Sequence, residues 1–94
     1  MKTVMIKIEM ISKNGCPPCR ILKPKFEKLN NDNIELYYFN ISEDEKYYQY
    51  AVENGVTAVP TFFLFYEQNG IINKEKYYGI NGFQEMEKKL KELE

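Results

Sequence analysis

The stretch that decides the fold is residues 4–22, which read VMIKIEMISKNGCPPCRIL. Its first half has an apolar residue at every second position, which predicts a strand with one well-buried face. Those apolar positions are Val4, Ile6, Ile8 and Met10. The polar turn 12–15 ends the strand, and Pro17 and Pro18 suit the first turn of a helix, where a missing N–H group leaves no bond unmade. The two cysteines are therefore expected at a strand-to-helix corner.

The rest of the chain continues this alternation of strands and helices. Ser42 and Glu45 form a capping box that predicts a helix start, Asn54-Gly55 predicts its end, and Asn69-Gly70 predicts a hairpin turn. The expected elements are strand 4–11, helix 17–30, strand 34–41, helix 42–54, strand 61–66, strand 71–78 and helix 83–93. The order βαβαββα predicts an α/β fold, a three-layer α/β/α sandwich around a four-stranded mixed sheet.

Length and composition exclude several classes of protein. Ninety-four residues with 44% hydrophobic content predict one folded domain, residues 1–94. Thirteen basic against fourteen acidic residues give a net charge of −1, which argues against nucleic-acid binding. No apolar run approaches the ~20 residues that span a membrane. Lys7 and Glu9 interrupt any signal-peptide core. We expect a cytoplasmic monomer without membrane partners.

Cys16 and Cys19 have the CxxC spacing of a redox pair. Cysteines three apart in a first helical turn can reach the ~4.4–6.8 Å Cα separation of a disulfide. Cys16 is expected to attack, because unpaired N–H groups and the helix dipole stabilise a thiolate at the N-terminus; Cys19 then resolves the mixed disulfide. A zinc site lacks ligands, since the chain has two cysteines and no histidine. Inert buried thiols and a structural disulfide are the remaining alternatives, although a disulfide that closes so short a loop stabilises a fold only weakly.

Four further features give the chain a resemblance to the thioredoxin family. Pro24 lies five residues after Cys19, and Pro60 follows Cys16 by 44 residues, both at the family's spacings. Residues 54–61, NGVTAVPT, resemble the family segment before the third strand, and Gly79 matches the glycine beside the active-site groove. The resemblance implies the thioredoxin fold, a cis Val59–Pro60 peptide bond and a loop that docks extended substrates. The implied substrate-binding residues are Gly15, Pro17, Ala58, Val59, Pro60 and Gly79.

Three positions depart from the family pattern. Gly15 stands where thioredoxins usually have Trp, Met10 where they have a buried Asp, and Tyr38 where they have Lys. The Asp normally helps the resolving thiol to lose its proton, so we expect slower deprotonation of Cys19. Strand alternation puts Glu9 on the opposite face from Met10, which argues against Glu9 as a substitute.

The leading hypothesis is a protein disulfide reductase that cycles between dithiol and disulfide, without metal or cofactor. Its implied partners are disulfide-containing proteins and an electron donor, either thioredoxin reductase or glutathione. A glutathione-dependent, glutaredoxin-like reductase is one alternative, although residues 79–82, GING, lack the double glycine and acidic residue usual there. A non-catalytic redox adaptor is the other alternative.

Overall fold

The computed structural model describes residues 5–93 of the chain. Its elements, in chain order, are β1 (Ile6–Ser12), α1 (Pro17–Glu27), β2 (Ile34–Asn40), α2 (Glu45–Glu53), β3 (Thr61–Gln68), β4 (Ile71–Tyr78) and α3 (Gly79–Leu93). This is the predicted order βαβαββα. Val4, which was expected in the first strand, lies outside the described residues.

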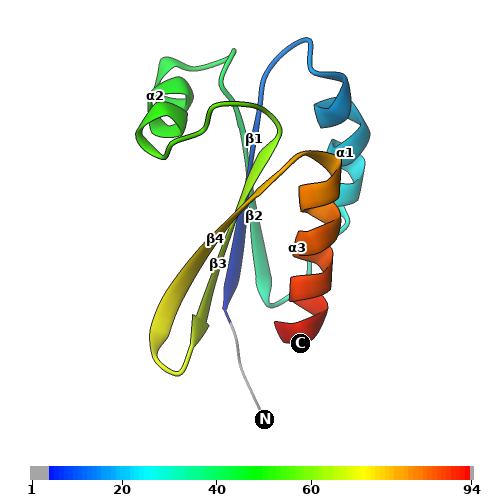
Figure 1. Ribbon diagram of the computed structural model, residues 1–94, viewed down its shortest axis with the longest axis vertical. Coiled ribbons are helices and arrows are strands. Elements are labelled where there is room, and N and C mark those ends of the chain that lie inside the picture. Colours follow the sequence, from blue (N-terminus) through cyan, green and yellow to red (C-terminus); the bar gives the residue numbers. More distant parts are fainter. Residues whose placement is uncertain (1–4, 94) are drawn as a thin grey trace.

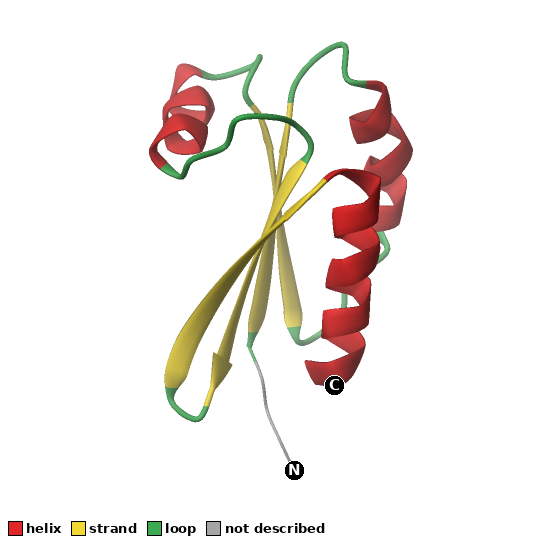
Figure 2. Cartoon of the chain, in the orientation of Figure 1, coloured by secondary structure: helices red, strands yellow, loops and turns green. Residues whose placement is uncertain are grey.

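The four strands form one mixed sheet in the order β2-β1-β3-β4. β1 pairs with β2 in parallel and with β3 antiparallel, and β3 and β4 form an antiparallel hairpin. Helices α1 and α3 lie on one face of the sheet and α2 lies on the other (Figures 1 and 2). The predicted three-layer sandwich is confirmed.

The larger core lies between the sheet and the α1–α3 layer. It contains β1 side chains from alternate positions, and Ile8 and Met10 are fully buried there beside Leu22 and Phe26 of α1. Burial of one large apolar side chain contributes about 1.5–3 kcal/mol, so this layer holds α1 firmly on the sheet. The smaller core under α2 is built on Ile11 from the other face of β1.

Two helix starts differ from the sequence prediction. Asp44, not Ser42, caps α2, because the Ser42 hydroxyl accepts a hydrogen bond from the Asn14 N–H in the neighbouring loop. Helix α3 begins at Gly79, four residues earlier than predicted. Gly79 has φ +73°, which turns the chain from β4 straight into the helix, so residues 79–82 form its first turn and not a loop.

Helix α1 is shorter than predicted and β3 is longer. Helix α1 ends at Glu27, because Leu29 and Asn30 already bond the carbonyls of Phe26 and Glu27 three residues back, as in a tight turn. Strand β3 continues to Gln68, so that the hairpin turn consists of Asn69 and Gly70, both with positive φ.

Candidate active site

The cysteine corner and the Pro60 loop meet at one edge of the sheet. β1 ends at Ser12 and delivers the loop that leads into α1, while β3 begins at Thr61. Ile11 pairs with Thr61 across the two strands. The residues that follow β1 therefore lie beside those that precede β3, at the upper edge in Figure 1.

Cys16 and Cys19 form a disulfide, with their Cα atoms 5.3 Å apart. Cys16 is the N-cap residue of α1 and has an extended backbone, and its Sγ accepts a hydrogen bond from the Cys19 N–H at 3.3 Å. Cys16 is 6% exposed and Cys19 2%. Both cysteines are thus buried in this disulfide form, and the cap position with its N–H donor is the setting from which the attacking role of Cys16 was predicted.

The loop 58–60 presents the second part of the predicted site. The Val59–Pro60 peptide bond is cis, as the resemblance implied. The Gly79 N–H donates to the Pro60 carbonyl at 3.0 Å, and the Thr61 hydroxyl donates to the Ala58 carbonyl at 2.7 Å. Pro60 is buried, Val59 is half-buried and Ala58 is exposed.

The predicted substrate-binding residues thus fall into two groups. Gly15 and Pro17 flank Cys16 and are exposed, and Gly79 is bonded to the loop 58–60. Because β1 and β3 are neighbours, both groups lie at the same sheet edge.

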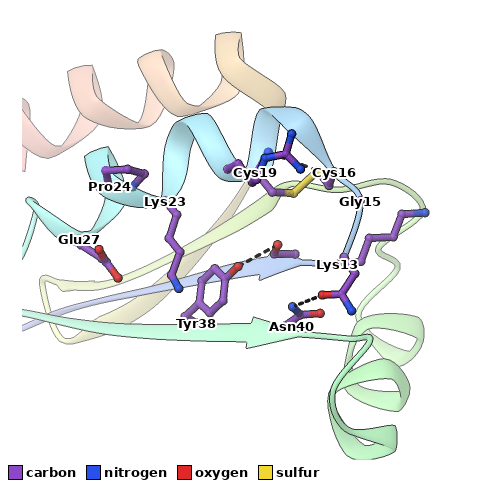
Figure 3. Close-up of a pocket in the computed structure, with 12 residues that line it drawn as sticks. Lys13, Gly15, Cys16, Cys19, Lys23, Pro24, Glu27, Tyr38 and Asn40 are labelled. Atoms are coloured by element: carbon purple, nitrogen blue, oxygen red, sulfur yellow. Dashed lines mark hydrogen bonds between the residues drawn. A yellow bond between two sulfur atoms is a disulfide. The ribbon is translucent and has the colours of Figure 1, made fainter.

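An open cavity of about 640 Å³ lies beside the disulfide; most of its lining residues are polar or charged, and both cysteines line it (Figure 3). At its floor the Tyr38 hydroxyl donates to the Ser12 hydroxyl at 3.0 Å, and the Asn40 amide donates to the Asn14 side chain at 3.0 Å. Lys23 reaches from α1 to Tyr38, with its Nζ 4.4 Å from the ring centroid.

The two residues that depart from the family pattern have distinct surroundings. Met10 is fully buried in the core cluster that contains Cys19. Tyr38 pairs with Met10 across β1 and β2, is half-buried, and turns its hydroxyl toward Ser12. Neither side chain supplies a carboxylate near Cys19.

Glu9 is the buried carboxylate of β1, and it lies on the other face of the sheet. It accepts a hydrogen bond from the Tyr50 hydroxyl of α2, and Lys7 Nζ lies 3.6 Å from its Oε2. Burial, followed by the hydrogen bond and charge of Glu9, raises the pKa of Tyr50 above its usual range. This arrangement agrees with the predicted exclusion of Glu9 as a proton acceptor for Cys19.

The sequence reasoning missed the polar network at the cavity floor. Asn40, which is 8% exposed, accepts the Ser42 N–H through its side chain and donates to Asn14. One asparagine just after the first strand and another at the end of its parallel neighbour were the available signal, because the carboxyl ends of such strands meet at one edge. Because Ser42 was interpreted as a helix cap, its hydrogen bonds with Asn14 and Asn40 were not predicted.

Other kinds of site lack the required features in the part of the chain that the structure describes. Within residues 5–93, no cluster of three or more histidine, cysteine, aspartate or glutamate side chains offers a place for a metal ion. None of the described helices has the length and apolar character needed to cross a bilayer.

Sequence comparisons place this arrangement among known proteins. The family model described as Thioredoxin matches residues 5–92. "Thioredoxin-2, mitochondrial" of Schizosaccharomyces pombe is 42% identical over 50 residues, which cover 53% of this chain and 37% of that protein. "Thioredoxin" of Methanocaldococcus jannaschii is 36% identical over 62 residues, which cover 63% of this chain and 69% of that protein. The matched segments of the two fission-yeast relatives span less than half of either protein.

Solved structures agree on the fold. Thioredoxin from Plasmodium falciparum superposes with a TM-score of 0.76 at 18% identity, over 98% of this chain and 74% of that one. Oxidised mitochondrial thioredoxin 3 from Saccharomyces cerevisiae gives a TM-score of 0.71 at 26% identity, over 94% of this chain and 78% of that one.

Proposed function

This chain belongs to the thioredoxin family, and on that premise we propose that it is a dithiol–disulfide oxidoreductase that reduces protein disulfides through Cys16 and Cys19. The observation that carries the proposal is the Cys16–Cys19 disulfide at the N-terminus of α1, beside the cis Val59–Pro60 loop. A bridge that closes so short a loop contributes little to stability, which favours a reactive role over a structural one.

The reduction proceeds in two exchanges. In the dithiol form, the Cys16 thiolate attacks one sulfur of a substrate disulfide; a Cys16–substrate bond forms, the substrate S–S bond breaks, and the other substrate sulfur leaves as a thiolate. Cys19 then loses its proton and attacks Cys16 Sγ. The Cys16–Cys19 bond forms, the second substrate thiolate leaves, and two electrons have passed to the substrate. The Cys16–Cys19 disulfide in the structure corresponds to the oxidised form that this proposed cycle would leave.

Substrate is held by backbone contacts beside the sulfurs. Val59 is half-buried and lies between α2 and β3. Within residues 5–93 its backbone N–H and carbonyl form no hydrogen bond, so they are available to pair with an extended substrate segment in a short β-like contact. Gly15, Pro17, Ala58 and Gly79 border this contact and leave it open, because none has a bulky side chain.

The electron donor we propose is a protein dithiol reductase of the thioredoxin reductase kind. Residues 79–82 form the first turn of α3 and contain no acidic side chain that would bind the amine of glutathione. We also propose that residues 1–94 act as a single domain, which the match over residues 5–92 supports. A cytoplasmic location stays a prediction from the sequence.

Trapping of mixed disulfides tests the proposal. The Cys19→Ser variant is expected to form a stable mixed disulfide with a disulfide-containing protein such as insulin, and Cys16→Ser is expected to form none. Trapping by Cys16→Ser alone would reverse the two roles.

Turnover tests the donor. Reduction of insulin driven by thioredoxin reductase is expected to proceed faster than glutathione-driven reduction of a small mixed disulfide. The reverse order would favour the glutaredoxin-like alternative. Failure of both assays in a folded protein would favour the non-catalytic adaptor.

A further inference from the structure

The cavity beside the disulfide carries an excess of positive charge. Lys13, Arg20 and Lys23 line it, and Glu27 is the single carboxylate among its described lining residues. Within residues 5–93, none of the three cations forms an ion pair with a carboxylate. The net charge of the chain is −1, so this excess is local.

Along α1, the two helix cations follow Cys19 more closely than the carboxylate does. A helix rises about 1.5 Å per residue, so Arg20 lies one step and Lys23 four steps beyond Cys19, whereas Glu27 lies about 12 Å further along the axis. Figure 3 shows Lys23 extending from α1 toward Tyr38, Lys13 extending outward from the loop before Gly15, and Glu27 at the far end of the cavity from the disulfide. A negative group near the sulfurs therefore meets mainly positive charge.

Lys23 is held in this orientation by its surroundings. Its Nζ lies 4.4 Å from the centroid of the Tyr38 ring, and the Tyr38 hydroxyl is fixed by its hydrogen bond to Ser12. A cation over an aromatic face keeps its charge and its hydrogen-bond donors for a further partner. Lys23 is thus a positioned cation, not a freely rotating surface lysine.

We propose that this cavity selects disulfides flanked by carboxylates, and that the preferred substrates are acidic polypeptide segments. The inference rests on the proposed function and names the substrate class of the same site. Opposite charges within the Debye length of about 8–10 Å attract, which raises the rate of productive encounter. The same cations offset the negative charge that the attacking and leaving thiolates place at the site.

The test compares three peptides that are identical except at the residues flanking one disulfide, which are Glu, Gln or Lys. The pre-reduced protein is mixed with each oxidised peptide, and the second-order rate constant is measured at low and high salt. We expect the Glu peptide to react about tenfold faster than the Lys peptide at low salt, with the gap closing at high salt. Equal rates, or a faster Lys peptide, overturn the proposal.

Variants assign the effect to the cavity. Lys23→Gln is expected to reduce the Glu-to-Lys rate ratio about twofold, because it removes one of three cations that share the tenfold effect, and Lys23→Arg is expected to retain the ratio. Lys46→Gln removes the same charge from exposed α2 and is expected to leave the ratio unchanged. The ratio is the chosen readout because any effect on the Cys16 thiolate itself acts on all three peptides equally. A ratio that falls as much in Lys46→Gln as in Lys23→Gln overturns the assignment to this cavity.

The remaining arms separate this inference from the proposed function. Reduction of the neutral Gln peptide tests the proposed function alone, so a protein that reduces none of the peptides contradicts that function. A charge preference among peptides that do react tests the further inference. Glutathione disulfide carries carboxylates but lacks an extended segment to pair with Val59. A faster reaction with glutathione disulfide than with the Glu peptide overturns the assignment to polypeptides.

Discussion

The Tyr50 hydroxyl donates a hydrogen bond to the carboxylate of Glu9, and this pair joins α2 to the sheet on the face opposite α1. Ala51 is the buried residue of α2, so the helix has a small apolar contact with the sheet and a polar anchor beside it. Glu9, the buried carboxylate of β1, therefore helps to hold α2, and the sheet separates it from the cysteines.

Glu9→Gln is expected to weaken the fold without slowing the resolving step. An amide binds a hydroxyl less strongly than a carboxylate does: a hydrogen bond to a charged group contributes about 1.5–3 kcal/mol and one between neutral groups about 0.5–1.5 kcal/mol. We expect urea unfolding to show a loss of about 1 kcal/mol. The rate of release of a model mixed disulfide should stay the same at pH 7. A slower release at unchanged stability would instead make Glu9 part of the proton path.

Alkaline pH is expected to destabilise the protein through Tyr50. Because burial and Glu9 raise its pKa, the folded state holds the phenol proton more tightly than the unfolded chain. This contribution is complete below the ordinary tyrosine pKa of about 10 and is lost as pH rises through the raised value. We expect urea unfolding between pH 8 and 11 to show a smaller alkaline loss in Tyr50→Phe than in the parent protein.

Tyr77 provides the control for that measurement. Burial, then its hydrogen bond to Glu75 and the charge of that carboxylate, raise the pKa of Tyr77 as well. The alkaline loss that remains in Tyr50→Phe is expected to shrink again in the double variant with Tyr77→Phe. An alkaline loss identical in all three proteins would contradict the assignment.

The order of elements, the layer arrangement and the cysteine corner were predictable because each depends on a local pattern. The alternation that includes Ile8 and Met10 can be recognised from the local sequence, without knowledge of which residues pack against it. The same holds for the prolines at the helix start. The start of α2 was not, because a contact between Ser42 and Asn14, 28 residues away, decided it. Hydropathy alone does not show which helix residues are buried either: Ile21 is as apolar as Leu22 but is 55% exposed, since α1 buries Leu22 and Phe26.

A carboxylate at position 10 is expected to restore an acid beside the resolving thiol at a cost in stability. Met10 is fully buried, and Met10→Asp places an uncompensated polar group in the core, which costs on the order of 3–5 kcal/mol. Where the protein remains folded, we expect faster release of the mixed disulfide at pH 7. Met10→Asn has the same shape and cannot take up a proton, so it should lose similar stability and gain no rate. A similar gain in both variants would rule out proton transfer as the cause.

Acid is expected to weaken the junction of β3, β4 and α3 at Glu75. Burial by itself raises the pKa of Glu75, but the hydrogen bonds from Tyr77 and Tyr66 and the charge of Lys89 outweigh it and lower the pKa. A lowered pKa stabilises the fold above the unfolded value of about 4.3, and the effect is lost as pH falls through the folded value. The stability difference between the parent and Glu75→Gln should therefore be full at pH 7 and shrink below pH ~4. Glu67→Gln, at an exposed position of β3, serves as control.

Gly82→Ala is expected to destabilise the protein although alanine is the better helix former. A Cβ at Gly82 would lie 3.1 Å from the Tyr77 carbonyl carbon and 3.2 Å from its Cβ. Tyr77 lies in β4, which is paired with β3, and its hydroxyl is bonded to Glu75, so it cannot move away at low cost. Overpacking costs about 1–3 kcal/mol and exceeds the ~1 kcal/mol gained in helix propensity.

A substitution at the neighbouring Asn81 distinguishes the effect of packing at position 82 from the effect of helix propensity. Asn81 is exposed in the same turn of α3, so Asn81→Ala is expected to raise the free energy of unfolding by a few tenths of a kcal/mol. Urea unfolding of both variants checks the pair. If residues 79–82 were a loop, as the predicted helix start at residue 83 implied, neither alanine would meet β4, and both would be nearly neutral. Opposite signs for the two substitutions are expected because α3 starts against the strand, where a side chain at position 82 has no room.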